Sequence, residues 1–287
     1  MSNDTNAVAS GGIISKLRAM PNDSPQKMLL FTVVLCFVCA VLVSSSRVLL
    51  RPLQKANQEL ERSTNILQAA GLFTPGADAI SLFARKVTPK LVDLDTGEYV
   101  EDQDVTRFNQ RKATKDPQQS RELLATEDVA GLKRRAKYAP VYLIKEAGEI
   151  QTIVLPINGK GLWSTMYGFL ALRGDGRTVL GITFYEQGET PGLGAEVANP
   201  KWQAKWVGKT VFDSQGQLAI QVTKRQTTPA EHHVDAIAGA TLTSTGVNNL
   251  IQFWLGGTWL QFWGKCSIRY RQWYRLCHGY CCSCRDS

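Results

Sequence analysis

Residues Asp235–Ser244 read Asp-Ala-Ile-Ala-Gly-Ala-Thr-Leu-Thr-Ser and run directly into an apolar helical pattern. This stretch joins one acidic residue to small residues, and Gly239 and Ala240 allow another molecule to approach the backbone closely. Four hydroxyl side chains lie within the five positions 241–245, at Thr241, Thr243, Ser244 and Thr245. Because it contains no basic residue and no cysteine, it is neither a P-loop nor a metal site. We therefore hypothesise that Thr241 is a covalent attachment point that another enzyme modifies.

A helix is predicted to begin at this stretch. Val247, Leu250, Ile251 and Trp254 recur at the spacing of one helical face. The hydroxyl residues that follow Thr241 are interpreted as N-cap residues of this helix. A phosphate held near a helix N-terminus is stabilised by the free amides and by the helix dipole.

Strand signals dominate the chain from Pro140 onward, and three hairpins are predicted from short apolar runs around turn residues. Their expected strands are Val141–Ile144 with Ile150–Pro156, Tyr167–Leu172 with Val179–Tyr185, and Val211–Asp213 with Leu218–Val222. A helical pattern from Pro52 to Gly71 precedes them. Hairpins with helices before and after them indicate an α+β fold that is built on antiparallel sheet.

A run of apolar residues near the N-terminus predicts a membrane anchor. Met28 to Val43 is unbroken except for Thr32, and with Ser44–Ser46 it approaches the ~20 residues that cross a bilayer core. A cleaved signal peptide is the alternative, but the run exceeds the usual apolar segment of about 7–15 residues. The basic residues do not decide the orientation, because both flanks carry them: Lys16, Arg18 and Lys27 before the run, and Arg47, Arg51 and Lys55 after it.

Four parts of the chain are expected on these grounds. They are a polar tail (1–26), a transmembrane helix (27–47), a soluble domain (48–256) and a C-terminal stretch of different composition (257–287). Cysteine is absent between Arg47 and Lys265, so the soluble domain depends on neither disulfides nor thiolate-bound metal.

The net charge of +8 over 287 residues suggests an anionic partner. However, the cluster at Lys133–Lys137 lacks the interleaved aromatic residues and glycines of an RNA-binding motif. We interpret it as a solvated basic face and expect no nucleic-acid partner.

Three further features precede the helix. Asn158–Gly168 contains Trp163 and Tyr167, which are candidate walls of a pocket for a flat ligand. Glu186–Gly194 contains Gly-Leu-Gly, but position 197 is Val, which excludes a Rossmann fingerprint. Adjacent histidines at 232 and 233 are expected in a surface loop, because neighbouring side chains point in different directions and no third ligand is visible.

Asp235–Thr241 resembles the flavinylation motif of FMN-binding domain proteins, in which the threonine receives FMN through a phosphoester bond made by a separate flavin transferase. The Leu-Trp-Ser-Thr-Met-Tyr-Gly and Gly-Glu-Thr-Pro-Gly-Leu-Gly stretches resemble those of the NqrC family, which belongs to sodium-translocating NADH:quinone reductases. A single N-terminal membrane helix also fits, and the resemblance covers about residues 20–256. The RnfG family of the Rnf electron-transport complex shares the motif and the layout.

The resemblance implies a membrane-anchored electron carrier with covalent FMN on Thr241 and no catalytic acid or base. Gly239 and Ala240 would give the transferase access, and Glu189, Thr190 and Leu193 are the expected flavin contacts. Other subunits of the complex, the transferase and membrane lipid are the expected partners. The implied location is the bacterial inner membrane, with the soluble domain in the periplasm.

Two departures from the family pattern stand out. Ala238 replaces the usual Ser or Thr of the motif, and the acceptor Thr241 is intact. The stretch 257–287 is rich in Cys, Arg and Trp, resembles translation in a shifted reading frame, and is expected to be poorly packed. Besides an Rnf-type protein, a membrane-tethered binding protein with an unmodified hydroxyl loop is the remaining alternative.

Overall fold

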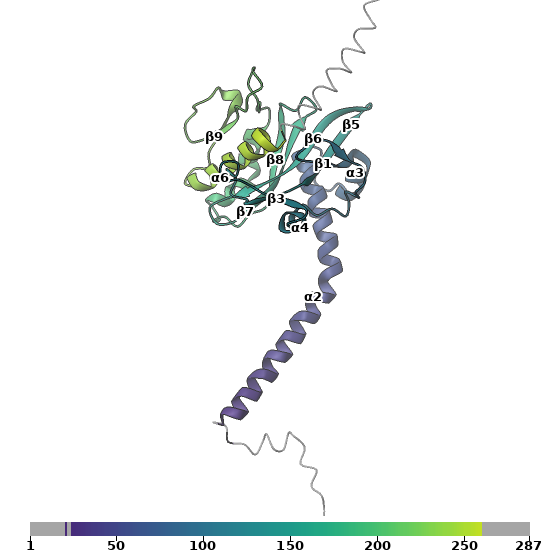
Figure 1. The fold of residues 1–287 in the computed structure, drawn as a ribbon, viewed down its shortest axis with the longest axis vertical. Coiled ribbons are helices and arrows are strands. Elements are labelled where there is room, and N and C mark those ends of the chain that lie inside the picture. The colour runs from purple at the N-terminus through teal and green to yellow at the C-terminus, as the bar shows by residue number, and fades with distance from the viewer. Residues whose placement is uncertain (1–20, 22–23, 260–287) are drawn as a thin grey trace, which may run out of the picture. The chain divides into compact units, whose positions relative to one another are not determined.

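The computed structural model describes residue 21 and residues 24–259. Its centre is a six-stranded antiparallel sheet in the order β2-β1-β5-β6-β7-β8 (Figure 1). The strands are β1 (Val87–Asp93), β2 (Tyr99–Val100), β5 (Tyr138–Glu146), β6 (Glu149–Lys160), β7 (Thr165–Arg173) and β8 (Val179–Glu186). The predicted α+β fold on antiparallel sheet is confirmed.

Two of the predicted hairpins form four consecutive strands of this sheet, from β5 to the edge strand β8. Strands β5 and β6 are joined by Ala147 and Gly148, which both have positive φ, at 51° and 85°. In the β7–β8 turn, the Asp175 carboxylate accepts hydrogen bonds from the amides of Arg177 and Thr178. Local turn chemistry therefore fixes both connections.

The third predicted hairpin is only partly formed. Its arms meet in one antiparallel bridge, Phe212 to Leu218, with backbone hydrogen bonds beside it, and they do not extend into two strands. The following segment, β9 (Gln221–Thr223), pairs in parallel with β10 (His233–Asp235) instead. Side chains of α6 (Thr241–Phe253) satisfy the backbone there: Asn248 accepts from the Val222 amide, and Gln252 donates to the Ile220 carbonyl. These side chains replace the hydrogen bonds that a second hairpin strand would have supplied.

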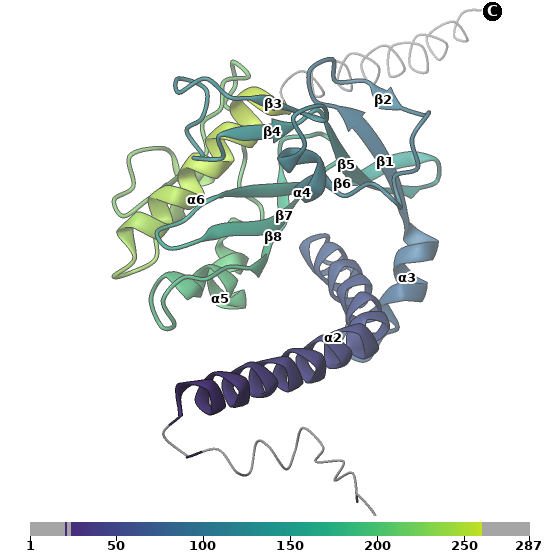
Figure 2. The ribbon, with the colours of Figure 1, turned by 60° about the horizontal axis from the view of Figure 1, so that its bottom comes forward.

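Both faces of the central sheet are buried. Because side chains alternate along a strand, neighbouring residues enter different cores. On β6, Ile153 and Leu155 belong to a large core that includes α6, whereas Val154 belongs to a second core. The second core contains Ile66 and Leu67 from the end of α2 (Pro25–Ala69), together with Ala79 from α3 (Ala79–Lys86). Figure 2 shows α6 beside the sheet, away from the end of α2.

Short elements complete the fold. They are α4 (Gln110–Lys115), α5 (Pro200–Gln203), β3 (Ser120–Glu122), β4 (Arg134–Ala136), the 3-10 helices Gly194–Ala198, Ala204–Trp206 and Ala230–His232, and a π-helix (Trp254–Thr258).

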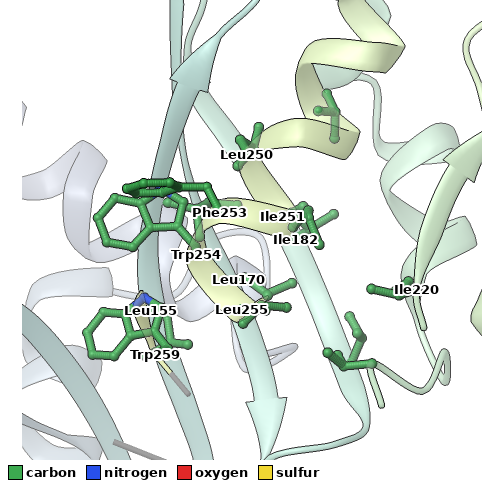
Figure 3. Close-up of a cluster of buried hydrophobic side chains, with 14 of the residues drawn as sticks. Leu155, Leu170, Ile182, Ile220, Leu250, Ile251, Phe253, Trp254, Leu255 and Trp259 are labelled. Carbon is green, nitrogen blue, oxygen red and sulfur yellow. The ribbon is translucent and has the colours of Figure 1, made fainter. Parts of the chain in front are cut away.

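The packing at the end of α6 continues past the expected domain boundary at residue 256. Trp254 and Trp259 are both fully buried, among Leu155, Leu170 and neighbouring apolar residues (Figure 3). The Trp254 indole donates a 2.7 Å hydrogen bond to the Asn158 carbonyl on β6. The remainder of the expected tail, 260–287, lies outside the described residues.

Helix α2 contains the predicted anchor and continues without a break through Pro52 to Ala69. Its apolar window has a mean hydropathy of 2.7, and the side chains of this window are exposed. The Thr32 hydroxyl donates to the Met28 carbonyl and the Ser46 hydroxyl to the Leu42 carbonyl, at 2.9 and 2.8 Å. Both hydroxyls are thus satisfied within the helix, as an apolar surrounding requires.

Candidate functional site

Thr241 is the first residue of α6 and is exposed. The loop before it turns at Gly239, which has a φ of 75° that favours glycine. The N-cap residue is Ala240, whose methyl group cannot accept a hydrogen bond from the first-turn amides. The helix therefore begins with an accessible hydroxyl and with amides that are available to an anion.

Glu189 lies next to this helix start, and its carboxylate accepts four hydrogen bonds. The residue is 5% exposed, and its carboxylate accepts a 2.5 Å hydrogen bond from the Thr243 hydroxyl. It also accepts three backbone hydrogen bonds, at 3.1, 3.0 and 3.2 Å, from the consecutive amides of Leu162, Trp163 and Ser164. One carboxylate thus joins α6, the 161–164 loop and the segment after β8.

These hydrogen bonds decide the protonation state of Glu189. Burial raises the pKa of its carboxyl, but the hydroxyl of Thr243 and the three amides together lower it by more, so the net pKa lies below the ordinary value of 4.5. The group is therefore ionised at neutral pH, although it is almost completely buried.

Glycines make room for this arrangement. A Cβ atom on Gly161 would lie 2.6 Å from Glu189 Oε1, and one on Gly194 would lie 2.5 Å from Thr243 Oγ1. A Cβ atom on Gly246 would lie 2.6 Å from the Lys160 carbonyl oxygen. The two loops and α6 approach each other as closely as they do because these positions carry no side chain.

Exposed apolar side chains also belong to this part of the molecule. They come from the segments that Glu189 joins, and comprise Leu162, Trp163, Leu193 and Leu242, which are 43%, 70%, 44% and 62% exposed. Leu193 approaches the 239 turn, because a Cβ atom on Gly239 would lie 3.1 Å from Leu193 Cδ2. Thr190 is exposed and accepts hydrogen bonds from the amides of Leu193 and Ala195 through its carbonyl.

The residues that the sequence singles out as a site are therefore brought together from two distant segments. Thr241, Gly239 and Ala240 come from the start of α6, and Glu189, Thr190 and Leu193 come from the loop after β8. The sequence does not predict that Thr243 and the three amides of the 161–164 loop bond Glu189. No spacing rule links these positions, which lie 54 and 25–27 residues from Glu189.

The expectation that the hydroxyls after Thr241 cap the helix is wrong. Thr243 bonds Glu189, and the Thr245 hydroxyl donates back to the Thr241 carbonyl. The Ser244 hydroxyl accepts from the Ile237 amide and donates to the Ala240 carbonyl, both at 2.9 Å. These side chains lie inside the helix, where a hydroxyl reaches the preceding turn rather than the first amides.

The two histidines are not in a surface loop, because His232 and His233 are buried. The His232 ring bonds the Thr210 carbonyl, and the His233 ring lies between the Thr223 hydroxyl and Asp235. In residues 21 and 24–259, no group of three or more His, Cys, Asp or Glu side chains could hold a metal ion. Asp235 also pairs with Lys205 at 2.9 Å, so the acid that opens the motif anchors a neighbouring segment.

The Tyr167 ring is covered on one face by Arg111 of α4. The Arg111 guanidinium lies 3.6 Å from the centre of its ring and pairs with Glu186 at 2.8 Å. Trp163 is available to a flat ligand, because this residue is 70% exposed.

The site lies within residues 161–256, and this range matches the FMN-binding domain family. The chain is 49% identical to NqrC of Pseudomonas aeruginosa, a subunit of the Na(+)-translocating NADH-quinone reductase, over 82% of this chain and 92% of that relative. The same protein of Vibrio anguillarum is also 49% identical, over 83% and 93%. The chain belongs to the NqrC family of sodium-translocating NADH-quinone reductase subunits.

Solved structures agree with this assignment. The crystal structure of Shewanella oneidensis NqrC superimposes with a TM-score of 0.67 at 35% identity, over 75% of this chain and 99% of that chain. The NqrC structure from Parabacteroides distasonis gives 0.59 at 27% identity, over 75% and 96%.

Proposed function

We propose that Thr241 carries FMN through a phosphoester bond at its Oγ1 atom. The observation that supports this proposal most directly is the exposed hydroxyl at the first position of α6, after a glycine turn. The α6 N-terminus favours a phosphate at this position, because its amides and the helix dipole both attract negative charge.

Each part of the site has a role in this proposal. Gly239 and Ala240 keep the hydroxyl accessible to a flavin transferase, and Thr190 and Leu193 contact the ribityl chain or the ring. Trp163 and Leu242 supply exposed apolar surface for a planar aromatic ring. When bound, FMN supplies one-electron transfer chemistry, and the protein supplies its orientation and electronic surroundings.

The attachment step requires an activated donor. The bond that forms joins Thr241 Oγ1 to the flavin phosphorus. The bond that breaks is the phosphoanhydride of a flavin dinucleotide, and the other half of the dinucleotide leaves as a nucleoside monophosphate. The hydroxyl proton passes to a base of the transferase and from there to solvent, since no residue of this chain is assigned as a general base.

We further propose that the protein is a membrane-anchored electron carrier in a sodium-pumping NADH:quinone oxidoreductase complex of the bacterial inner membrane. Family membership supports this proposal, as does the apolar span of α2 with its internally satisfied Thr32 and Ser46 hydroxyls. The other membrane subunits, the flavin transferase and lipid are its partners, and the soluble domain lies in the periplasm.

The test is co-expression of the full chain with a flavin transferase, followed by in-gel flavin fluorescence after denaturation. We expect fluorescence in the wild type and none in Thr241→Ala. Thr245→Ala is the matched control, because Thr245 is also an exposed hydroxyl in the first turns of α6. Fluorescence in Thr241→Ala, or an unchanged intact mass of the wild type beside an active transferase, would overturn the proposal and favour an unmodified binding protein.

A further inference from the structure

We propose that Glu189 is the positioning residue of the Thr241 site, which holds the first turn of α6 against the 161–164 loop before any flavin is attached. The inference rests on the proposed function for its effect on flavin attachment. Its effect on the protein without flavin is independent of that function.

Both oxygens of the Glu189 carboxylate accept hydrogen bonds from donors of the protein itself. Oε1 accepts from the amides of Trp163 and Ser164, and Oε2 accepts from the Leu162 amide and the Thr243 hydroxyl. With 5% exposure, the side chain has little surface left for a ligand. Glu189 therefore serves the site by holding other groups, in place of the flavin contact expected from the sequence.

All four hydrogen-bond partners of Glu189 are donors, so position 189 requires a side chain that only accepts. An ionised carboxylate accepts at both oxygens, whereas a glutamine would turn an NH2 group toward a donor. The 2.5 Å distance from the Thr243 hydroxyl is that of a charge-assisted O–H···O⁻ hydrogen bond. Leaving one buried amide or hydroxyl without its acceptor destabilises the arrangement.

Glu189 holds two parts of the site, the first turn of α6 and the 161–164 loop. Thr243 lies two residues after Thr241 in the same helix turn, so fixing Thr243 also fixes the backbone that carries Thr241. On the opposite side, the three amides fix the loop that carries Leu162 and Trp163. The carboxylate thus sets the distance between the acceptor hydroxyl and the exposed apolar side chains.

A second tie closes the same loop independently of the carboxylate. The Ser164 hydroxyl accepts a 2.7 Å hydrogen bond from the Gly188 amide, and the Gly161 amide donates to the Ser164 carbonyl at 2.7 Å. Because this tie remains when Glu189 is substituted, we expect the loop to loosen locally without unfolding of the domain.

The experiment compares four variants of the full chain. Glu189→Gln removes the pure acceptor, and Thr243→Val removes one donor at nearly constant shape. Thr243→Ser restores the hydroxyl and is the conservative rescue. Glu196→Gln is the matched control, because Glu196 lies in the same segment and bonds Asn199 rather than the site.

The first measurement is amide hydrogen exchange of the protein prepared without transferase. In Glu189→Gln we expect the amides of residues 162–164 to exchange roughly tenfold faster, since hydrogen bonds to a charged group are lost. The amides of β5 and β6 should exchange as in the wild type. Unchanged exchange at 162–164 would overturn the inference, whether or not the chain takes up flavin.

The second measurement is the initial rate of FMN attachment, followed by intact mass, at a temperature where every variant is folded. We expect the rate to fall roughly tenfold in Glu189→Gln and in Thr243→Val, to recover in Thr243→Ser, and to be unchanged in Glu196→Gln. Faster exchange with a wild-type attachment rate would show a merely structural role and overturn the inference. A wild type that takes up no flavin beside an active transferase defeats the proposed function alone.

Discussion

The Thr243 hydroxyl donates a 2.5 Å hydrogen bond to the Glu189 carboxylate, and this contact joins two segments that lie 54 residues apart in the chain. It places the start of α6 against the loop that follows β8. Both partners are buried, at 2% and 5% exposure, so the hydrogen bond is shielded from water. The exposed Thr241 hydroxyl is therefore mounted on a first turn with a fixed position.

The stability of the domain should depend on pH through Glu189. Its pKa is lowered on folding, so its contribution is complete above the ordinary value of 4.5 and is lost as the pH falls through the lower folded pKa. Thermal unfolding of wild type and Glu189→Gln, followed by circular dichroism, should show a lower Tm for the variant at pH 7. That difference should shrink progressively below about pH 4.5. An equal difference in Tm at pH 7 and at about pH 3 would contradict this assignment.

Gly194 should not tolerate a side chain. In Gly194→Ala the new Cβ atom would lie 2.5 Å from Thr243 Oγ1 and 2.9 Å from Glu189 Cβ, so the segment must shift. We expect a loss of about 1–3 kcal/mol in the free energy of unfolding, measured with urea. Gly257→Ala is the control, because no atom lies within 4 Å of its Cβ position, and it should change the stability little.

The β5–β6 turn offers a stabilising substitution. Ala147 has a φ of 51° and precedes Gly148, also with positive φ, which is the geometry that favours Asn-Gly. Ala147→Asn should therefore raise the free energy of unfolding by about 0.5–1 kcal/mol. Ala125→Asn, at an exposed position, is the comparison, and a similar gain there would remove the turn-specific explanation.

The indole of Trp254 should matter through its hydrogen bond as well as its packing. In Trp254→Phe the Asn158 carbonyl loses its 2.7 Å donor and the buried cluster loses volume. A decrease of about 2–4 kcal/mol is expected in the free energy of unfolding. The same substitution at Trp163, which is 70% exposed, should change stability by less than about 0.5 kcal/mol, and a large effect there would count against this account.

Much of the fold can be predicted from the sequence because its signals are local. The Asp175-Gly176 turn and the two-residue turn at 147–148 specify their hairpins through backbone conformation and short hydrogen bonds. The apolar run in α2 and the helical face of α6 follow from side-chain periodicity. The third hairpin stops at a single bridge, because Asn248 and Gln252, which lie well outside it in the sequence, bond the backbone of residues 220–222.

The sequence by itself determined the antiparallel α+β class, the apolar N-terminal helix and the small-residue loop that presents Thr241. Only the tertiary structure decided what Thr243 and Glu189 do, since their pairing depends on close packing at Gly161 and Gly194. It also decided that the hydroxyls after Thr241 bond other groups than the first amides of α6, and that both histidines are buried. Local patterns encode backbone conformation, whereas the partners of a buried polar group depend on which distant segments pack against it.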